Sequence, residues 1–127
     1  MPHLSIEYSP TLETRADMRG LCMALHVVMV DTEIFPTAGI RIRAHKAENA
    51  IVADGHEDND FLAMTLAVGA GRSVEQLQAA GDALFAAARA ALSGPLATPH
   101  FALSLEIRVI DPALSWKETP IHARLSV

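Results

Sequence analysis

A proline follows the first methionine in the opening segment MPHLSIEYS, and it has the most unusual potential chemistry in this chain. Small residues at position two generally let an initiator methionine be removed, so the mature chain is expected to begin at Pro2 with a free secondary amine. Such an amine accepts a proton when apolar surroundings or nearby cations lower its pKa toward neutrality. The alternative is structural, because proline also suits the start of an edge strand, where no amide N–H is needed. Pro2 is therefore a candidate general base.

Three arginines are candidates for binding an anionic ligand. Arg41 and Arg43 lie two residues apart in AGIRIR, and Arg72 lies in GAGRS. A guanidinium group stays charged and can donate two parallel hydrogen bonds to a carboxylate. Arg72 also precedes an expected helix start, where free backbone N–H groups of residues 71–74 favour an anion. The alternative for each is a surface ion pair with one of the 15 acidic residues, and it weighs most for Arg43.

The sequence disfavours sites for metals, nucleotides and nucleic acids. The 6 histidines are scattered, with no H-E-x-x-H motif and no cysteine pair at ligand spacing, so no metal is expected. GAGRS lacks the lysine and the full glycine spacing of a phosphate-binding loop, which argues against a nucleotide. The net charge of -5 argues against a nucleic-acid partner. We therefore expect no cofactor.

The length and composition are typical of one compact domain over residues 1–127, with 50% hydrophobic and 20% charged residues. The most apolar stretch, LCMALHVVMV, contains His26 and is too short to cross a membrane. No positively charged segment precedes an apolar one, so a signal peptide is not expected. A lone Cys22 cannot form an internal disulfide, which suits a reducing compartment. These features predict a cytoplasmic protein that does not interact with membranes.

Two halves of the chain, at about residues 1–46 and 60–111, follow the same plan of strand, helix and strand. In the first half, HLSIEYS and IRIRAH alternate as strands, and helical spacing from Thr14 predicts a helix that ends before IFP. Thr14 and Asp17 have the spacing of an N-terminal cap pair. The polar segment between the halves contains AIVADG, which has the features of a short hairpin with the preceding strand.

The second half begins with FLAMTLAV, a nearly continuous apolar run that predicts a strand covered on both faces. Ser73 and Gln76 have capping-box spacing at the start of a helix that ends near the Gly-Pro of LSGP. FALSLEIRVI alternates as the last strand, and a C-terminal segment, residues 112–127, follows. We expect its Trp116 to anchor this segment against a neighbouring subunit.

The two halves together predict the fold class. A helix between two strands makes a βαβ unit with parallel strands, so the fold is α/β, or α+β in some schemes. Two consecutive units give a four-stranded mixed sheet with two helices on one face. Because FLAMTLAV has the composition of a strand covered on both faces, oligomerisation is expected to cover the other face.

Several of these motifs resemble a known family. The opening MPHLSIEYS, the segment IFPTAGIRIRAH, the ADG turn and above all MTLAVGAGRSVEQLQAAGDALF are similar to 5-carboxymethyl-2-hydroxymuconate isomerase of the tautomerase superfamily. The resemblance runs from Met1 to about Phe85, with a weaker match from FALSLEI to the end. It implies a tautomerase-like fold, a homotrimer and an N-terminal proline that acts as the base. It also implies a small dienol substrate with two or three carboxylates, derived from aromatic ring cleavage.

This resemblance implies a cofactor-free isomerase that converts 5-carboxymethyl-2-hydroxymuconate, or a similar dienol polycarboxylate, to its keto isomer in meta-cleavage degradation of aromatic acids. Pro2 is the expected base and proton carrier, and Arg41 and Arg72, with Arg43 as a weaker third, are expected to bind carboxylates. Met1 must be removed, because an acylated Pro2 nitrogen has no useful basicity. Two alternatives stay open: an enzyme of this fold that acts on another enol acid, by tautomerisation, hydration or dehalogenation, and a non-catalytic trimeric binding module.

Overall fold

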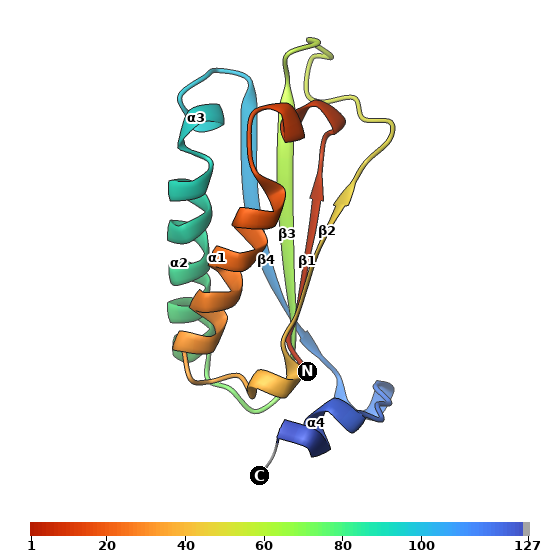
Figure 1. Ribbon diagram of the computed structural model, residues 1–127. Coiled ribbons are helices and arrows are strands. Elements are labelled where there is room, and N and C mark those ends of the chain that lie inside the picture. The colour runs from red at the N-terminus through yellow and green to blue at the C-terminus, as the bar shows by residue number, and fades with distance from the viewer. Residues whose placement is uncertain (126–127) are drawn as a thin grey trace.

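The computed structural model describes residues 1–125 of the chain. Four strands form one mixed sheet in the order β2-β1-β3-β4 (Figure 1). The inner strand β1 (His3–Tyr8) runs parallel to β2 (Arg41–Lys46) and antiparallel to β3 (Asp60–Gly69). At the other edge, β4 (Phe101–Ile110) runs parallel to β3. This topology confirms the two predicted βαβ units and the mixed sheet.

The first long helix, α1 (Met18–Asp31), connects β1 to β2 and packs on one face of the sheet (Figure 1). It begins at the N-cap Asp17, whose side chain accepts a hydrogen bond from the Gly20 N–H at 3.0 Å. The predicted cap pair of Thr14 with Asp17 is wrong. Thr14 instead ends the short 3-10 helix η1 (Pro10–Thr14), because this turn precedes the helix and Asp17 alone caps it.

The second long helix, α2 (Val74–Ala91), lies beside α1 and connects β3 to β4 (Figure 1). Its start is the capping box that the sequence predicts: Ser73 accepts from the Gln76 N–H at 3.1 Å, and Gln76 accepts from the Ser73 N–H at 2.9 Å. The helix is followed by the one-turn helix α3 (Ser93–Leu96), which contains the predicted Gly-Pro stop. Both helices lie on the same face of the sheet, as expected.

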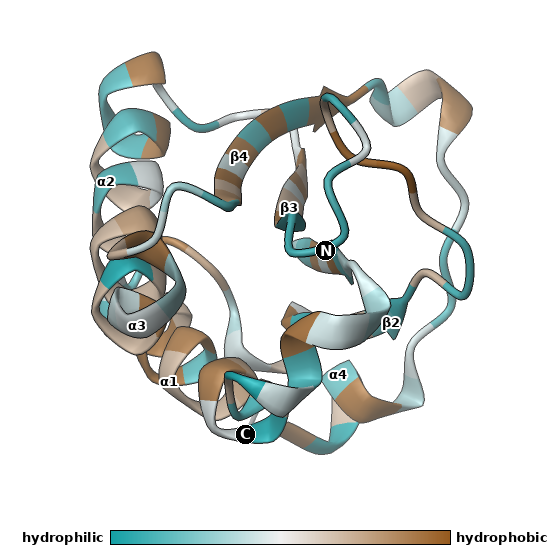
Figure 2. Cartoon of the chain, turned by 90° about the horizontal axis from the view of Figure 1, so that it is seen from above, coloured by the Kyte–Doolittle hydropathy of each residue, from teal (hydrophilic) through white to brown (hydrophobic). Residues whose placement is uncertain are grey.

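The hydrophobic core lies between this pair of helices and the sheet. The face of β3 that meets the helices is fully buried, whereas the alternate residues of β3 are only half-buried. Figure 2 shows the corresponding alternation of hydrophobic and hydrophilic residues along β4. Among residues 1–125 the helices pack on one face of β3 only, as expected from the sequence, and the cover of the second face by another copy of the chain stays a prediction. The largest fully buried residues include Leu4, Ile6, Leu21, Leu25, Met29, Leu62, Met64, Leu66 and Leu84.

The segment between the halves, residues 47–59, contains turns and no strand, so the hairpin predicted for AIVADG is wrong. Side-chain hydrogen bonds hold this segment in a closed loop instead. Asn59 Nδ2 donates to the Val52 carbonyl at 3.0 Å and to Asp54 Oδ1 at 2.7 Å. Gly55 completes the turn with a φ of 83°, and its N–H donates to the Val52 carbonyl at 2.9 Å.

The C-terminal segment lies at the end of the sheet that carries the amino terminus (Figure 1). Its described part, residues 112–125, consists of a 3-10 helix, η3 (Pro112–Leu114), a stretch without regular secondary structure and the short helix α4 (Pro120–Leu125). Helix α4 contacts the 3-10 helix η2 (Thr37–Gly39), which precedes β2. Over residues 1–125, no helix combines the length and the hydropathy needed to cross a membrane.

Candidate active site

Pro2 is buried immediately before the inner strand β1. Its carbonyl oxygen accepts a hydrogen bond from the Arg41 N–H at 3.0 Å, so the β1–β2 ladder extends to Pro2. Gly39 leaves room for the proline ring, because a Cβ at Gly39 would lie 3.1 Å from Pro2 Cδ. Met1 is joined to Pro2 here, which makes the Pro2 nitrogen an amide nitrogen. The backbone around Pro2 is thus fixed by the sheet.

Three cationic side chains lower the pKa of the amino terminus beside Pro2. The pKa of the Met1 amine is lowered, first by burial and then by the charges of Lys117, Arg72 and Arg41. Both effects disfavour an ammonium ion and favour the neutral amine, which is the form that accepts a proton. The structure therefore brings two of the predicted arginines to the amino terminus and adds a lysine.

Backbone carbonyls hold the guanidinium group of Arg41. Its Nη1 donates to the carbonyl oxygen of Ala38 at 2.7 Å and to that of Ile40 at 3.0 Å. Both acceptors flank Gly39, against which the Pro2 ring packs. Neutral carbonyls orient the guanidinium without cancelling its charge, so the charge stays available to a ligand.

Arg72 is held in a similar way by two carbonyls and one aromatic ring. Its Nε donates to the Ile34 carbonyl at 2.9 Å, and its Nη1 donates to the Gly69 carbonyl at 3.3 Å. The guanidinium carbon lies 5.0 Å from the centre of the Phe35 ring, a cation–π contact. These contacts tie the loop after β3 to the α1–β2 connection, and no acidic side chain among residues 1–125 pairs with the guanidinium.

Ion pairs do not account for the cations of this site. Over residues 1–125, the salt bridges join Arg15 to Asp60, Lys46 to Glu13 and Arg108 to Glu106. None of them involves Arg41, Arg43, Arg72 or Lys117. The surface ion pair considered for the three arginines is therefore not formed within the described part of the chain.

Arg43 contacts the side chain of His3 at the start of β1. It is exposed on β2, and its Nη1 lies 3.1 Å from His3 Nδ1. The pKa of His3 is lowered by burial first and then by Arg43, the amino terminus and Arg41. A lowered pKa favours the neutral form of His3, whose Nδ1 can accept a hydrogen bond from Arg43. Arg43 is thus coupled to the amino terminus through His3.

Two cavities meet at Met1 and Lys117. The first has a volume of about 350 Å³, and the second has a volume of about 530 Å³. Residues that line the first include Met1, His3, Gly69, Ile110, Trp116 and Lys117. Residues that line the second include Met1, Pro36, Gly39, Lys117, Thr119 and His122. Pro2 and the arginines do not line these cavities while Met1 is present, so Met1 lies between the open space and the predicted base.

Lys117 and Trp116 are residues of this site that the sequence analysis did not place there. Both lie in the C-terminal segment, which carries no motif that would bring it back to the amino terminus. Trp116 is 86% exposed and lines the first cavity, and its predicted contact with a neighbouring subunit stays a prediction. The only sequence signal for Lys117 is its positive charge next to an aromatic residue.

Comparisons with known proteins identify the family of this chain. The family model for 5-carboxymethyl-2-hydroxymuconate isomerase matches residues 2–125. The 5-carboxymethyl-2-hydroxymuconate Delta-isomerase of Escherichia coli is 38% identical over 123 residues, which cover 97% of this chain and 98% of that protein. The sequence-based assignment to this family is thereby confirmed.

Solved structures give the same result for the fold. The crystal structure of a 5-carboxymethyl-2-hydroxymuconate isomerase from Deinococcus radiodurans R1 matches with a TM-score of 0.89 and 37% identity, over 97% of this chain and 92% of that one. A fused 4-OT symmetric trimer matches with a TM-score of 0.62 and 16% identity, over 91% of this chain and 93% of that one, which shows the fold alone. The predicted tautomerase-like fold is confirmed, and the chain belongs to the 5-carboxymethyl-2-hydroxymuconate isomerase family.

Proposed function

We propose that this protein is an isomerase that converts 5-carboxymethyl-2-hydroxymuconate to its keto isomer, with the amine of Pro2 as the base. The observation that carries this mechanism is that Arg41, Arg72 and Lys117, which have no acidic partner among residues 1–125, lower the pKa of the amino terminus next to Pro2. The family and the 38% identical relative support the reaction. The direct test is the rate at which the ultraviolet absorption of the dienol disappears at neutral pH.

The reaction needs one group that first accepts a proton and then returns it. The neutral amine takes the proton from the 2-hydroxyl oxygen, and the electrons of that bond form the carbonyl. The double bonds shift along the chain, and the electron pair at carbon 5 takes the proton back from the ammonium. Such a base acts best when its pKa lies near the working pH. Burial and nearby cations move the amine in this direction.

The cations also fit the charge of the substrate. The proposed substrate carries three carboxylates, one on the carboxymethyl group and two at the ends of the muconate chain. Arg41, Arg72 and Lys117 offer three positive charges around the amino terminus. The same charges stabilise the negative charge that develops on the enolate oxygen in the transition state. We assign carboxylate binding to Arg41 and Arg72 first, with Lys117 at the exposed side of the site and Arg43 as a weaker contributor through His3.

Removal of Met1 is part of the proposal. Met1 acylates the Pro2 nitrogen and lines both cavities. A chain that begins at Pro2 would therefore gain the free amine and open both cavities toward it. The positive charges that lower the pKa of the Met1 amine would then act on the Pro2 amine, which lies one residue along the chain.

We further propose a homotrimer of single-domain chains that works in a reducing, cytoplasmic environment. The half-buried second face of β3 and the exposed Val109, Leu114 and Trp116 support an interface between copies. The single Cys22, which cannot form a disulfide within the chain, supports the reducing compartment. Light scattering coupled to size-exclusion chromatography measures the oligomeric state, and a monomeric mass would contradict the trimer.

Replacing Lys117 by Met is expected to raise KM by only about fivefold. An exposed ion pair between Lys117 and a substrate carboxylate contributes little to the binding free energy. The substitution is also expected to shift the pH profile of kcat/KM. The Lys117 charge lowers the pKa of the amine, so its loss raises that pKa, and the neutral base then predominates only at higher pH. The acid limb of the profile should therefore move to higher pH.

The matched control for this substitution is Lys46→Met. Lys46 is paired with Glu13 at 3.2 Å, at the end of β2 away from Pro2, so its loss should leave KM and the acid limb unchanged. An acid limb that moves equally in both variants would show that overall charge, and not Lys117, sets the amine pKa.

A further inference from the structure

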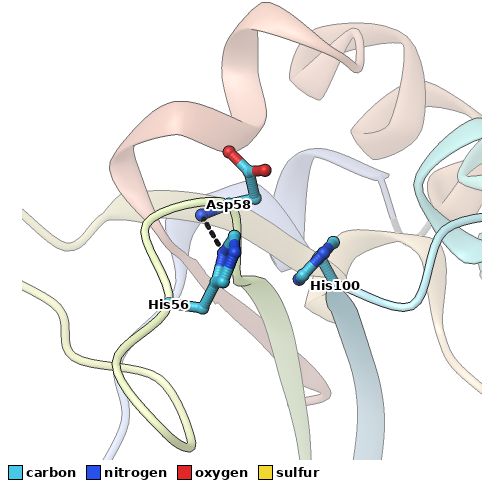
Figure 3. A group of neighbouring side chains, drawn as sticks. All are labelled: His56, Asp58 and His100. Carbon is cyan, nitrogen blue, oxygen red and sulfur yellow. Dashed lines mark hydrogen bonds between the residues drawn. The ribbon is translucent and has the colours of Figure 1, made fainter.

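Two loops bring three potential metal ligands together at the end of the sheet away from Pro2 (Figure 3). His56 and Asp58 lie in the loop before β3, and His100 immediately precedes β4. One nitrogen of each imidazole and one carboxylate oxygen of Asp58 lie within 4.8 Å of one another. The two rings are stacked, with their centres 4.4 Å apart. Sequence spacing did not predict this cluster, because its members come from separate loops.

The length of β3 separates this cluster from the candidate active site. His100 and Asn59 adjoin Asp60 at the start of β3, whereas Gly69 at its end lines the first cavity. A strand rises about 3.3 Å per residue, so the two sites lie on the order of 30 Å apart. The cluster has no part in the isomerase site.

Asn59 orients the ring of His100. Its Nδ2 donates both hydrogens, to the Val52 carbonyl and to Asp54 Oδ1, and these oxygens only accept. Asn59 Oδ1 is therefore the acceptor that lies 2.9 Å from His100 Nδ1. The ring proton of a neutral His100 is thus on Nδ1, and Nε2 keeps a free lone pair. Metal-ligating histidines commonly donate their other ring N–H to an oxygen in this way.

Arg15 holds the loop that contains His56 and Asp58. Arg15 Nη2 donates to the Asp58 carbonyl at 2.8 Å, and Arg15 also pairs with the buried Asp60. The Asp58 N–H donates to His56 Nδ1 at 3.1 Å (Figure 3). A metal bound through His56 would replace this hydrogen bond, because a neutral imidazole has one lone pair to offer. Both residues are exposed, so no packed core surrounds the His56 ring.

We propose that His56, Asp58 and His100 bind one divalent transition-metal ion per chain, with Zn²⁺ as the best-suited ion. Two imidazole nitrogens and one carboxylate oxygen form a borderline donor set that suits Zn²⁺, and water completes four ligands. The ion joins the loop of residues 47–59 to the segment before β4. Its role is to tie these loops together, far from the isomerase chemistry. The expectation from sequence that there is no metal site is revised accordingly.

Calorimetric titration of the full chain with Zn²⁺ tests this site. We expect one ion per chain, and at least a tenfold loss of affinity in His56→Ala and in His100→Ala. Asn59→Ala removes no ligand but frees the His100 ring, so it should weaken binding by about tenfold. The matched control is His26→Ala, since His26 is an exposed histidine on α1 and should leave the affinity unchanged.

Ring nitrogen shifts in NMR spectra provide a second measurement, with a selective change expected at His56 and His100 on adding Zn²⁺. Absence of binding by the parent chain overturns the proposal, as does equal affinity in His100→Ala and His26→Ala. Circular dichroism checks that each variant is folded. If a histidine variant does not fold, Asp58→Asn takes its place in the titration, because it removes a ligand but keeps the shape of the side chain. Chelation by EDTA should leave the isomerase rate unchanged, and a dependence of that rate on Zn²⁺ contradicts the separation of the two sites.

Discussion

Blocking the Pro2 nitrogen is expected to lower kcat/KM for dienol ketonisation by about 10²- to 10⁴-fold, the usual contribution of a general base. An acylated proline nitrogen shares its lone pair with the carbonyl group and cannot accept the substrate proton. The measurement compares a chain that begins at Pro2 with one that keeps Met1, each verified by intact mass. The retained Met1 also occupies space that lines both cavities, so weaker substrate binding is expected as well.

Pro2→Ala separates these two effects. Once its methionine is removed, this variant begins with a primary amine and has the same open cavities, so it should retain carboxylate binding while kcat falls. Equal rates for the blocked and the free chain would mean that the base is another group. If the chain that begins at Pro2 binds a non-reactive tricarboxylate but does not accelerate ketonisation, the protein acts on another enol acid or serves for binding alone.

Arg72→Ala is expected to lower kcat/KM by about 10- to 100-fold, since a hydrogen bond to a charged group contributes about 1.5–3 kcal/mol. The guanidinium carries its charge without an acidic partner among residues 1–125, and its position is set by Ile34, Gly69 and Phe35. Arg72 also lowers the pKa of the amino terminus. Steady-state kinetics over a range of pH should therefore show a higher KM, a lower kcat and an acid limb moved to higher pH.

Two further substitutions test whether the effect of Arg72→Ala depends on the guanidinium group and on its position in the site. Arg72→Lys keeps the positive charge but loses the guanidinium contact with Phe35 and the Nε hydrogen bond to the Ile34 carbonyl, so it should recover only part of the activity. Arg43→Ala removes an exposed guanidinium that contacts His3, and it should change kcat/KM by no more than about twofold. An effect of Arg43→Ala as large as that of Arg72→Ala would reverse this assignment. Thermal unfolding of each variant checks that packing is preserved.

Much of the fold was predictable because local patterns and tertiary structure agree. The alternation of FALSLEIRVI extends over the whole of β4, Phe101–Ile110, since one face of that strand packs on α2 and the other does not. The loop of residues 47–59 was predicted wrongly because the side chain of Asn59 closes it, and an amide bonding across the loop leaves no periodic signal. The Thr14 cap pair failed for a similar reason, as a 3-10 turn competes for that residue.

The register of β1 with β2 and with β3 brings the predicted site residues together. His3 pairs with Arg41 on β2 and with Ala67 on β3, so Pro2, Arg41 and the loop that carries Arg72 meet at one end of the sheet. Motifs at strand ends therefore locate this part of the site. Lys117 was not predictable in this way, because the path of the C-terminal segment back to the amino terminus depends on packing and not on a pattern within the segment.

The position of β1 in the sheet has a consequence for the dynamics of the protein. β1 is bonded to β2 on one side and to β3 on the other, and the Arg41 N–H bond extends this protection to the Pro2 carbonyl. Amides in such a strand exchange with deuterium mainly when the whole domain unfolds, whereas amides of exposed loops exchange through small local openings. We expect protection factors to be highest along the two inner strands, β1 and β3, and lowest in the loop of residues 47–59. We therefore expect the backbone at Pro2 to stay in place while the loops open and close.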